Sequence, residues 1–334
     1  MDPLTRRHAL ARAALAMAMP ALASWPAIAA DYPARPVRMV VPYGPGGASD
    51  LLARSISDGL AREMGQPVVV DNKPGAGGVI AATAVLSQPA DGHTIYYVTE
   101  SMYVLTQLVN QHANRPVTVD MRKEFAPITT IVDIPIVLIV RSDVPASNLQ
   151  AFIAYARSQP AGTLNFASDG VGSSTHLAGE MLKMAGRFDA VHVPYKGTGD
   201  QTQGILAGQI HFAFLAVQAG VNYARQGKMK VIAVAGSERV RQLPDVATAP
   251  QQGFPDLTLT SWHGFAVRTG TDPAIVTALN RQIRKVAAAP ELVQKMAASG
   301  LVVATGTPAQ AAARADASFR KWSEVLAASK VRLD

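Results

Sequence analysis

Residues 37–60 read VRMVVPYGPGGASDLLARSISDGL and hold a β-branched run, a glycine loop and a helical pattern in direct succession. Val37–Val41 predicts a strand because most of its residues are β-branched. Apolar residues then recur at Leu52, Ile56 and Leu60, which is the spacing of one face of a helix. A strand, a glycine turn and a helix form the first half of a βαβ unit, so this stretch predicts an α/β fold.

The same succession recurs along the first third of the chain. Val68–Val70 precedes the glycine-rich loop Asn72–Gly78, and an amphipathic stretch then runs through Leu86. Ile95–Val98 follows as a third predicted strand. Because helices connect these strands, we expect them to pair in parallel, with right-handed crossovers.

A second α/β series begins near Ile131. Ser147 is the expected N-cap of a helix that runs through Ala156, and further helices are expected at Gln201–Leu206 and Val221–Arg225. The predicted strands of this series are Ile136–Val140, Leu164–Ala167, Ala190–Pro194, Ile210–Ala216 and Met229–Ala235.

The chain closes with three predicted helices between Ala274 and Leu326, after an extended segment at Trp262–Val267. Each helix has one apolar face and no sheet of its own, so we expect all three to pack on the first sheet. The chain then crosses twice between two lobes. The expected division is residues 31–131 with 258–334 for lobe 1 and residues 132–257 for lobe 2, with a ligand site in the cleft between them.

The composition predicts a folded protein of two domains and argues against several kinds of partner. The 334 residues exceed one ordinary domain, and a hydrophobic content of 49% excludes intrinsic disorder. The net charge of +7 includes no dense basic run, so no nucleic-acid partner is expected. Cysteine is absent, and the 7 histidines show no metal-binding spacing. We therefore expect neither a cofactor nor a metal.

Residues 1–29 are typical of a removable export signal. Arginines precede an Ala/Leu/Met-rich stretch, and Ala27–Ala29 supplies the small residues that a signal peptidase recognises. Prolines interrupt the stretch, which argues against a membrane-spanning helix. The pair Arg6-Arg7 leaves both the general secretory and the twin-arginine routes open.

Three glycine-rich loops follow predicted strands and precede helices: Tyr43–Asp50, Asn72–Gly78 and Ser168–Thr175. Each offers backbone N–H groups and the positive end of a helix dipole, which hold an anion without a cationic side chain. One such loop is usually an ordinary turn, but three in register favour a site. The candidate ligand-binding residues are Tyr43, Gly46, Gly47, Ser49, Asp50, Gly77, Gly78, Ser101, Ser168, Asp169, Gly172, Ser173, Ser174, His176 and Tyr195. For Asp50, a helix-capping role and a contact with a ligand donor group both remain open.

Two enzymatic interpretations compete with a binding protein. A nucleotide site lacks support because no P-loop is present and Gly44–Ser49 lacks the third glycine of a dinucleotide fingerprint. A hydrolase could use Ser173, His176 and Asp169, but no Gly-x-Ser-x-Gly elbow surrounds the serine. We expect no enzyme, with an exported hydrolase or nucleotide-dependent enzyme using Ser173 and His176 as the alternative.

Longer motifs resemble a known family. YPARPVRMVVPYGPGGASDLLAR, QPVVVDNKPGAGG, SDGVGSSTHLAGE, HVPYKGTGD and SWHGF occur in this order. Together they resemble the Bug family, the substrate-binding proteins of tripartite tricarboxylate transporters, over essentially the whole mature chain. The resemblance implies a two-lobed, type II-like periplasmic-binding-protein fold, each lobe a doubly wound, mainly parallel sheet with flanking helices.

The function that this resemblance implies is capture of a small carboxylate, whether a di- or tricarboxylic, amino or aromatic acid. Delivery to the membrane subunits of the transporter, a periplasmic location and a monomeric state follow from the same resemblance. His93, where a tyrosine is usual, and Val267-Arg268 depart from the family pattern but lie outside the three loops. Glu100–Tyr103 is also individual and is a candidate for tuning ligand choice.

Overall fold

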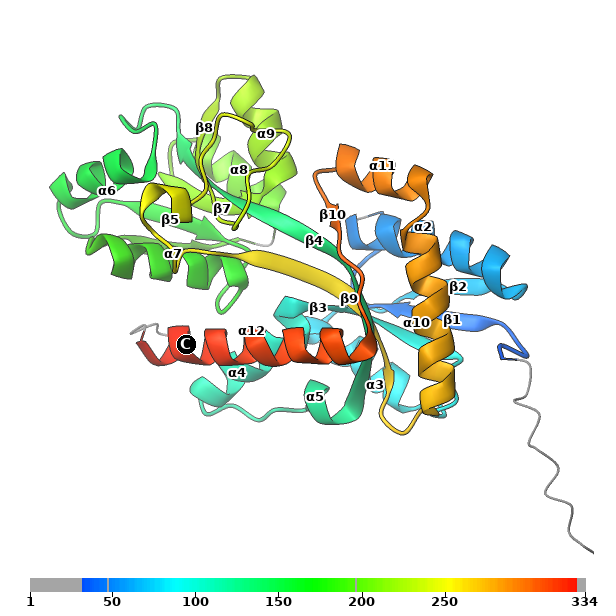
Figure 1. Cartoon of the computed structure of the whole chain (residues 1–334). Helices are drawn as coiled ribbons and strands as arrows, with labels where there is room; N and C mark the ends of the chain where they lie inside the picture. Colours follow the sequence, from blue (N-terminus) through cyan, green and yellow to red (C-terminus); the bar gives the residue numbers. More distant parts are fainter. Residues whose placement is uncertain (1–31, 47, 196, 329–334) are drawn as a thin grey trace, which may run out of the picture.

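The computed structural model describes residues 32–46, 48–195 and 197–328, so the predicted export signal and Gly47 lie outside the described residues. Figure 1 shows two α/β lobes joined by two long strands, β4 (Phe125–Arg141) and β9 (Thr260–Arg268). The predicted α/β architecture and the two connections between lobes are therefore present.

Lobe 1 is built on a mixed sheet. Strands β1 (Val37–Val41), β2 (Val68–Asn72) and β3 (Thr94–Thr99) are parallel, as predicted, and have the order β2-β1-β3. Strand β9 then pairs antiparallel with both β3 and β4, and β10 (Val302–Val303) pairs with β4. The helices of this lobe are α2 (Ala48–Met64), α3 (Val79–Leu86), α4 (Thr106–His112), α5 (Met121–Glu124), α10 (Pro273–Ala287), α11 (Pro290–Ala298) and α12 (Pro308–Ala328). Short turns of helix occupy Ala76–Gly78 (η1) and Ser101–Leu105 (η2).

Lobe 2 repeats this design around the second half of β4. Parallel strands β5 (Asn165–Ser168), β6 (Val191–Pro194) and β7 (Phe212–Ala216) have the order β7-β5-β6, and β7 and β8 (Met229–Val234) pair antiparallel with β4. The helices are α6 (Leu149–Ser158), α7 (Ser174–Gly186), α8 (Thr198–Leu206) and α9 (Val217–Arg225), with a short turn η3 at Pro250–Gln252. Both sheets are thus mixed, because the joining strands run antiparallel, rather than mainly parallel.

The change from one sheet to the other happens inside β4. Residues up to Pro135 pair with β9, and residues from Ile136 onward pair with β7 and β8. Proline has no N–H to donate, so it fits a position where the hydrogen-bonded partner changes. The predicted strand at Ile136–Val140 is therefore only the second half of a 17-residue strand.

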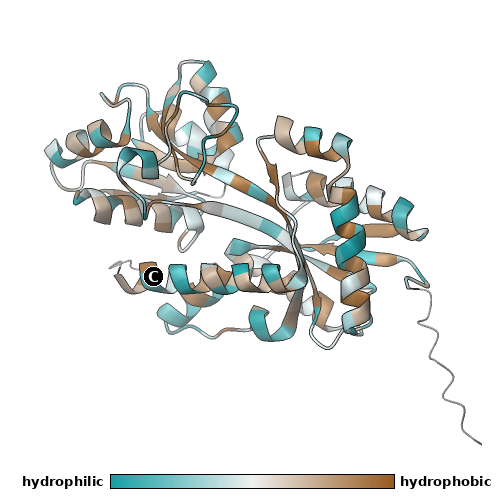
Figure 2. Cartoon of the chain, in the orientation of Figure 1, coloured by the Kyte–Doolittle hydropathy of each residue, from teal (hydrophilic) through white to brown (hydrophobic). Residues whose placement is uncertain are grey.

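Burial on both faces explains why the strands are mainly apolar. Val37, Met39 and Val41 pack with helices α2 and α10 on one face of the lobe 1 sheet. Val40 points to the other face, where a second core runs on into lobe 2. Figure 2 shows the matching pattern, with hydrophobic strands inside and helices that alternate hydrophobic and hydrophilic turns.

Two details differ from the sequence predictions. Helix α6 is capped by Asn148, whose side chain accepts from the Ala151 N–H at 2.8 Å, and not by Ser147. Either residue type can cap, and the choice follows from the helix starting at buried Leu149. Helices α10 and α11 pack on lobe 1 as predicted, whereas α12 also contacts α7 of lobe 2 (Figure 1).

Among residues 32–46, 48–195 and 197–328, helices with the length and hydrophobicity to span a membrane are absent.

Candidate functional site

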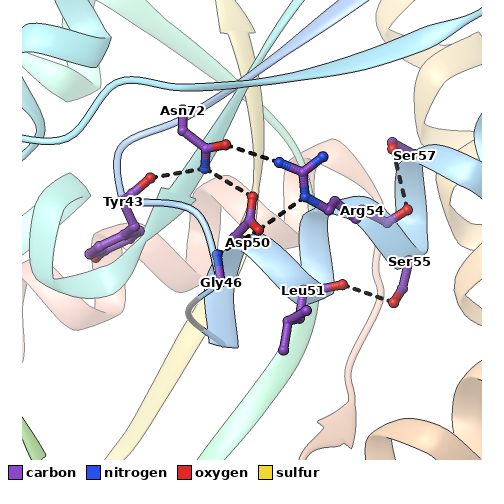
Figure 3. A network of polar contacts seen from close by, with 8 residues as sticks. All are labelled: Tyr43, Gly46, Asp50, Leu51, Arg54, Ser55, Ser57 and Asn72. Atoms are coloured by element: carbon purple, nitrogen blue, oxygen red, sulfur yellow. Dashed lines mark hydrogen bonds and ion pairs between the residues drawn. The ribbon is translucent and has the colours of Figure 1, made fainter.

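The loop between β1 and α2 is held by a buried carboxylate (Figure 3). Asp50 is 2% exposed and accepts hydrogen bonds from the Gly46 N–H at 2.9 Å, Asn72 Nδ2 at 2.9 Å and Arg54 Nε at 3.0 Å. Asn72 also donates to the Tyr43 carbonyl at 2.9 Å. The Arg54 hydrogen bond is the main cause that lowers the pKa of Asp50 to about 2. Of the two roles left open for Asp50, these contacts support fixing the start of α2.

Replacing Asp50 by alanine is expected to lower the free energy of unfolding by about 2 kcal/mol, because three donors lose their acceptor. Chemical denaturation measures the change. Asp58→Ala is the matched control, since Asp58 is an exposed acid of the same helix. Equal losses in the two variants would contradict the proposed role of Asp50.

Three side chains beneath this loop link it to the strand that joins the lobes, and Tyr97 is the buried member. Tyr97 Oη lies 2.6 Å from His263 Nδ1 on β9, and the Ser49 side chain lies close to the Tyr97 hydroxyl. Burial lowers the pKa of His263 to about 4, so the ring that shares this hydrogen bond with the tyrosine is neutral. Sequence reasoning missed Tyr97 and His263 because only the fold brings these residues to Ser49.

Tyr43 brings the two lobes together. Its hydroxyl lies 3.1 Å from Thr99 Oγ1 at the end of β3. Burial raises the pKa of Tyr43, and the negative charge of Asp169 in lobe 2 adds to this rise. Gly172 of lobe 2 also approaches lobe 1, because a Cβ there would lie 2.5 Å from Val109 Cγ2. The loop 168–175 therefore lies against lobe 1, with Asp169 close enough to Tyr43 to affect its pKa.

The loop after β2 has a left-handed backbone that only glycine adopts easily. The φ angles of Gly75, Gly77 and Gly78 are 121°, 59° and 92°. Gly78 is buried, a Cβ there would overlap Met102, and its carbonyl accepts from Tyr96 Oη at 3.0 Å. Gly78 is therefore needed for packing, whereas Gly77 is exposed.

The loop after β5 uses its side chains to hold itself in shape. Ser173 caps α7 by accepting from the His176 N–H at 3.2 Å and donates to the Gly170 carbonyl at 2.8 Å. The Thr175 hydroxyl accepts from the Asp169 N–H at 3.0 Å. The Asp169 carboxylate accepts from Gln201 Nε2 at 2.5 Å, and burial raises the pKa of this carboxyl.

His176 has a structural environment. It is 2% exposed, its Nδ1 accepts from the Gly172 N–H at 3.0 Å, and its ring stacks on His192 with 3.6 Å between centroids. Burial lowers the pKa of His176 to about 3 and that of His192 to about 4. His192 Nε2 lies 2.6 Å from Ser168 Oγ. Both rings are therefore neutral, and His192 is a loop-forming residue that the sequence did not single out.

These contacts do not form the catalytic triad that the hydrolase interpretation requires. Ser173 bonds the backbone of His176 and not its ring, while His176 Nδ1 holds a backbone N–H. Asp169 bonds Thr175 and Gln201. A triad needs a serine–imidazole–carboxylate chain.

What the site offers chemically is a set of amides at helix starts. In an α-helix the first N–H groups have no intrahelical acceptor, and the dipole makes them attractive to anions. Ser49 in α2 and Ser174 and Thr175 in α7 hold such positions, one set in each lobe. Ser101 starts η2 and is half-buried. Tyr195 instead packs its hydroxyl against Gly204 in the core of lobe 2.

A small cavity lies where the lobes meet. It has a volume of ≈ 10 Å³ and is lined by Glu100, Ile136, Ser174, Thr175, Leu259, Ser261 and Trp322. Glu100 is 5% exposed, and burial raises the pKa of its carboxyl. The sequence analysis marked the segment that contains this residue as individual and as a candidate for tuning ligand choice. Within the part of the chain that the structure describes, no cluster of three or more His, Asp or Glu side chains could hold a metal ion.

Comparison with known proteins gives consistent matches. A family model for the tripartite tricarboxylate transporter family receptor (TctC) matches residues 52–330. Protein BugT of Bordetella pertussis is 30% identical over 308 residues, which cover 92% of this chain and 93% of BugT.

Two solved structures are similar along their length. MatC from Rhodopseudomonas palustris with bound malate has a TM-score of 0.73 at 29% identity, covering 88% of this chain and 100% of MatC. A second R. palustris protein, solved with adipate, has a TM-score of 0.77 at 29% identity, covering 88% of this chain and 97% of its own. These matches confirm the fold class predicted from the sequence.

Proposed function

Because the chain belongs to the tripartite tricarboxylate transporter receptor family, we propose that it captures a small carboxylate between its lobes and delivers it to the membrane subunits of such a transporter. The observation that carries the proposal is the nearness of Tyr43, in the loop that leads into α2, to Asp169, in the loop that leads into α7 of the opposite lobe. Contacts from both lobes give a ligand higher affinity for the closed arrangement, which is what closure requires.

The ligand class is supported by the chemistry of the loops and by the relatives. Helix starts bind carboxylates through backbone N–H groups, and serine hydroxyls add further donors. Two similar proteins hold malate and adipate in their solved structures. The residues that we propose to contact the ligand are Tyr43, Gly46, Gly47, Ser49, Gly77, Ser101 and Ser174. The residues that we propose to shape the loops are Asp50, Gly78, Ser168, Asp169, Gly172, Ser173 and His176.

We propose that the protein binds and does not turn over its ligand. Ser173 and His176, the pair that an enzyme would need, are both engaged in holding their own loop. We place the protein in the periplasm, with residues 1–29 as its export signal. The division into lobes remains a proposal, and the exchange of strand partners at Pro135/Ile136 supports a first boundary about four residues later than predicted.

Titration calorimetry of residues 30–334 with mono-, di- and tricarboxylates, amino acids, ATP and NAD tests the function. Binding of a carboxylate, without turnover and without binding of either nucleotide, is the expected result. Binding of ATP or NAD alone, or ester hydrolysis that disappears in Ser173→Ala, would support the enzymatic alternative instead.

Ser174→Pro separates the amide from the hydroxyl at the start of α7. Proline is well tolerated at the first helical position, and Ser173 already has the extended backbone that a residue before proline prefers. The variant lacks one N–H donor, so we expect affinity to fall roughly 10- to 100-fold, as for a hydrogen bond to a charged group. Calorimetry measures the loss. Ser174→Ala keeps the amide and should bind within about threefold of wild type; an equal loss in both variants would refute amide binding.

A further inference from the structure

Glu100 is a buried carboxylate that forms no direct ion pair among the described residues. Its Oε1 accepts from Ser318 Oγ at 2.7 Å and from Trp322 Nε1 at 3.1 Å. Among the described residues, Oε2 accepts no hydrogen bond and the side chain forms no ion pair. Two cations attract Glu100 from beyond ion-pair distance: Arg314, which pairs with Asp133 at 2.6 Å, and Lys321, which donates to the Thr258 carbonyl.

An unpaired buried carboxylate is costly unless something completes its environment. Glu100 is 5% exposed and sits at the end of β3, between helix α12 and the space where the lobes meet. It lines the same small cavity as Ser174 and Thr175, the first two residues of α7. A negative side chain and an anion-attracting helix start thus border one space.

The size of this space limits what can enter it beside Glu100. A volume of ≈ 10 Å³ admits one water-sized group. An ammonium group has that size and would form a direct ion pair with Glu100, whereas a carboxylate is larger and would be repelled by the ionised Glu100. The α7 start can meanwhile take the carboxylate of the same ligand.

We propose that Glu100 is a specificity-determining residue that selects carboxylates bearing an ammonium group over dicarboxylates. This inference rests on the proposed function. The preferred ligand class is therefore a zwitterionic amino acid. This preference differs from the malate and adipate held by two relatives.

Matched pairs of small acids test this preference in residues 30–334. In each pair an ammonium replaces one carboxylate while the number of methylene groups stays the same. The pairs are glycine and malonate, 3-aminopropanoate and succinate, and 4-aminobutanoate and glutarate. α-Amino acids with larger side chains complete the panel. We expect wild type to bind amino acids at least tenfold more tightly than dicarboxylates by calorimetry. Glu100→Gln should reduce that ratio at least tenfold, because the amide keeps the shape but loses the charge.

Controls separate this inference from general damage and from the proposed function. Glu324→Gln makes the same charge change at an exposed position of α12 and should keep the wild-type ratio. Thermal melts establish that Glu100→Gln folds. The inference is overturned if wild type prefers dicarboxylates, or if a folded Glu100→Gln keeps the wild-type ratio of amino-acid to dicarboxylate affinity. Either result leaves carboxylate binding itself in place. Failure of wild type to bind any acid overturns the proposed function itself.

Discussion

Gly264→Ala is expected to destabilise the protein by about 3 kcal/mol or more, because the new methyl group meets backbone that cannot move aside. A Cβ at this position would lie 2.5 Å from the Thr129 carbonyl oxygen and 3.1 Å from the Thr130 Cα. Gly264 is in β9, paired on one side with β3 and on the other with β4. The strand is therefore fixed on both sides and cannot shift away from the clash.

Urea denaturation of the variant and of wild type measures this effect. Gly199→Ala is the matched control, because Gly199 lies exposed in α8 and a Cβ there meets nothing within 4 Å. The control variant should have the same free energy of unfolding as wild type or a slightly higher one, because alanine has a higher helix propensity than glycine. A Gly264→Ala protein as stable as wild type would mean that β4 and β9 can separate locally without cost.

The folded protein should lose stability as the pH falls from 6.5 toward 3, and His176 should be a main cause. Its pKa is lowered from 6.5 to about 3, chiefly by burial, so the folded state resists a proton that the unfolded state accepts. The free energy of unfolding linked to this group is therefore at its full value above pH 6.5, and it decreases as the pH falls from 6.5 toward 3. By pH 4.5 the loss should reach about 2 to 3 kcal/mol for His176 alone.

A variant isolates this contribution from those of other groups. Asn at position 176 can still accept from the Gly172 N–H but does not titrate, so His176→Asn should show a shallower fall of stability between pH 7.5 and 4.5. The raised pKa of Asp169 acts in the opposite direction, which is why the difference between variant and wild type is the quantity to compare. His112→Asn, at an exposed histidine, serves as control. Parallel curves for His176→Asn and wild type would contradict the assignment.

Much of the fold could be predicted because local patterns determine it. The β1 strand follows from its β-branched residues and the Leu52/Ile56/Leu60 face of α2 from its period of 3.6 residues, and both are buried. The first half of β4 was missed although Thr129 and Thr130 are β-branched, because prolines at positions 127 and 135 interrupt the stretch. The threonine hydroxyls are buried and donate to the Gly306 and Ala304 carbonyls, far away in the sequence. A local pattern contains no information about such partners.

The loops of the candidate site could be predicted from the sequence, but the contacts that each of their polar groups makes could not. Glycine-rich turns after strands indicated where backbone N–H groups gather. Which of them stay available depends on contacts that the fold creates, such as Gly172 donating to the His176 ring. The partner of Asp50, Asn72, lies on the next strand, and Glu100 faces lobe 2 residues more than 70 positions away. The ligand contacts of the candidate residues remain predictions.

Strand β4 has a mechanical consequence, because it belongs to both sheets. Sliding one lobe past the other would break its hydrogen-bonded ladders with β9 on one side and with β7 and β8 on the other. Bending β4 where it exchanges partners leaves both ladders intact, and Pro135 at that point has no N–H bond to lose. The lobes are thus joined by a strand that can bend at one point, so we expect opening to be a rotation about Pro135 and not a slide.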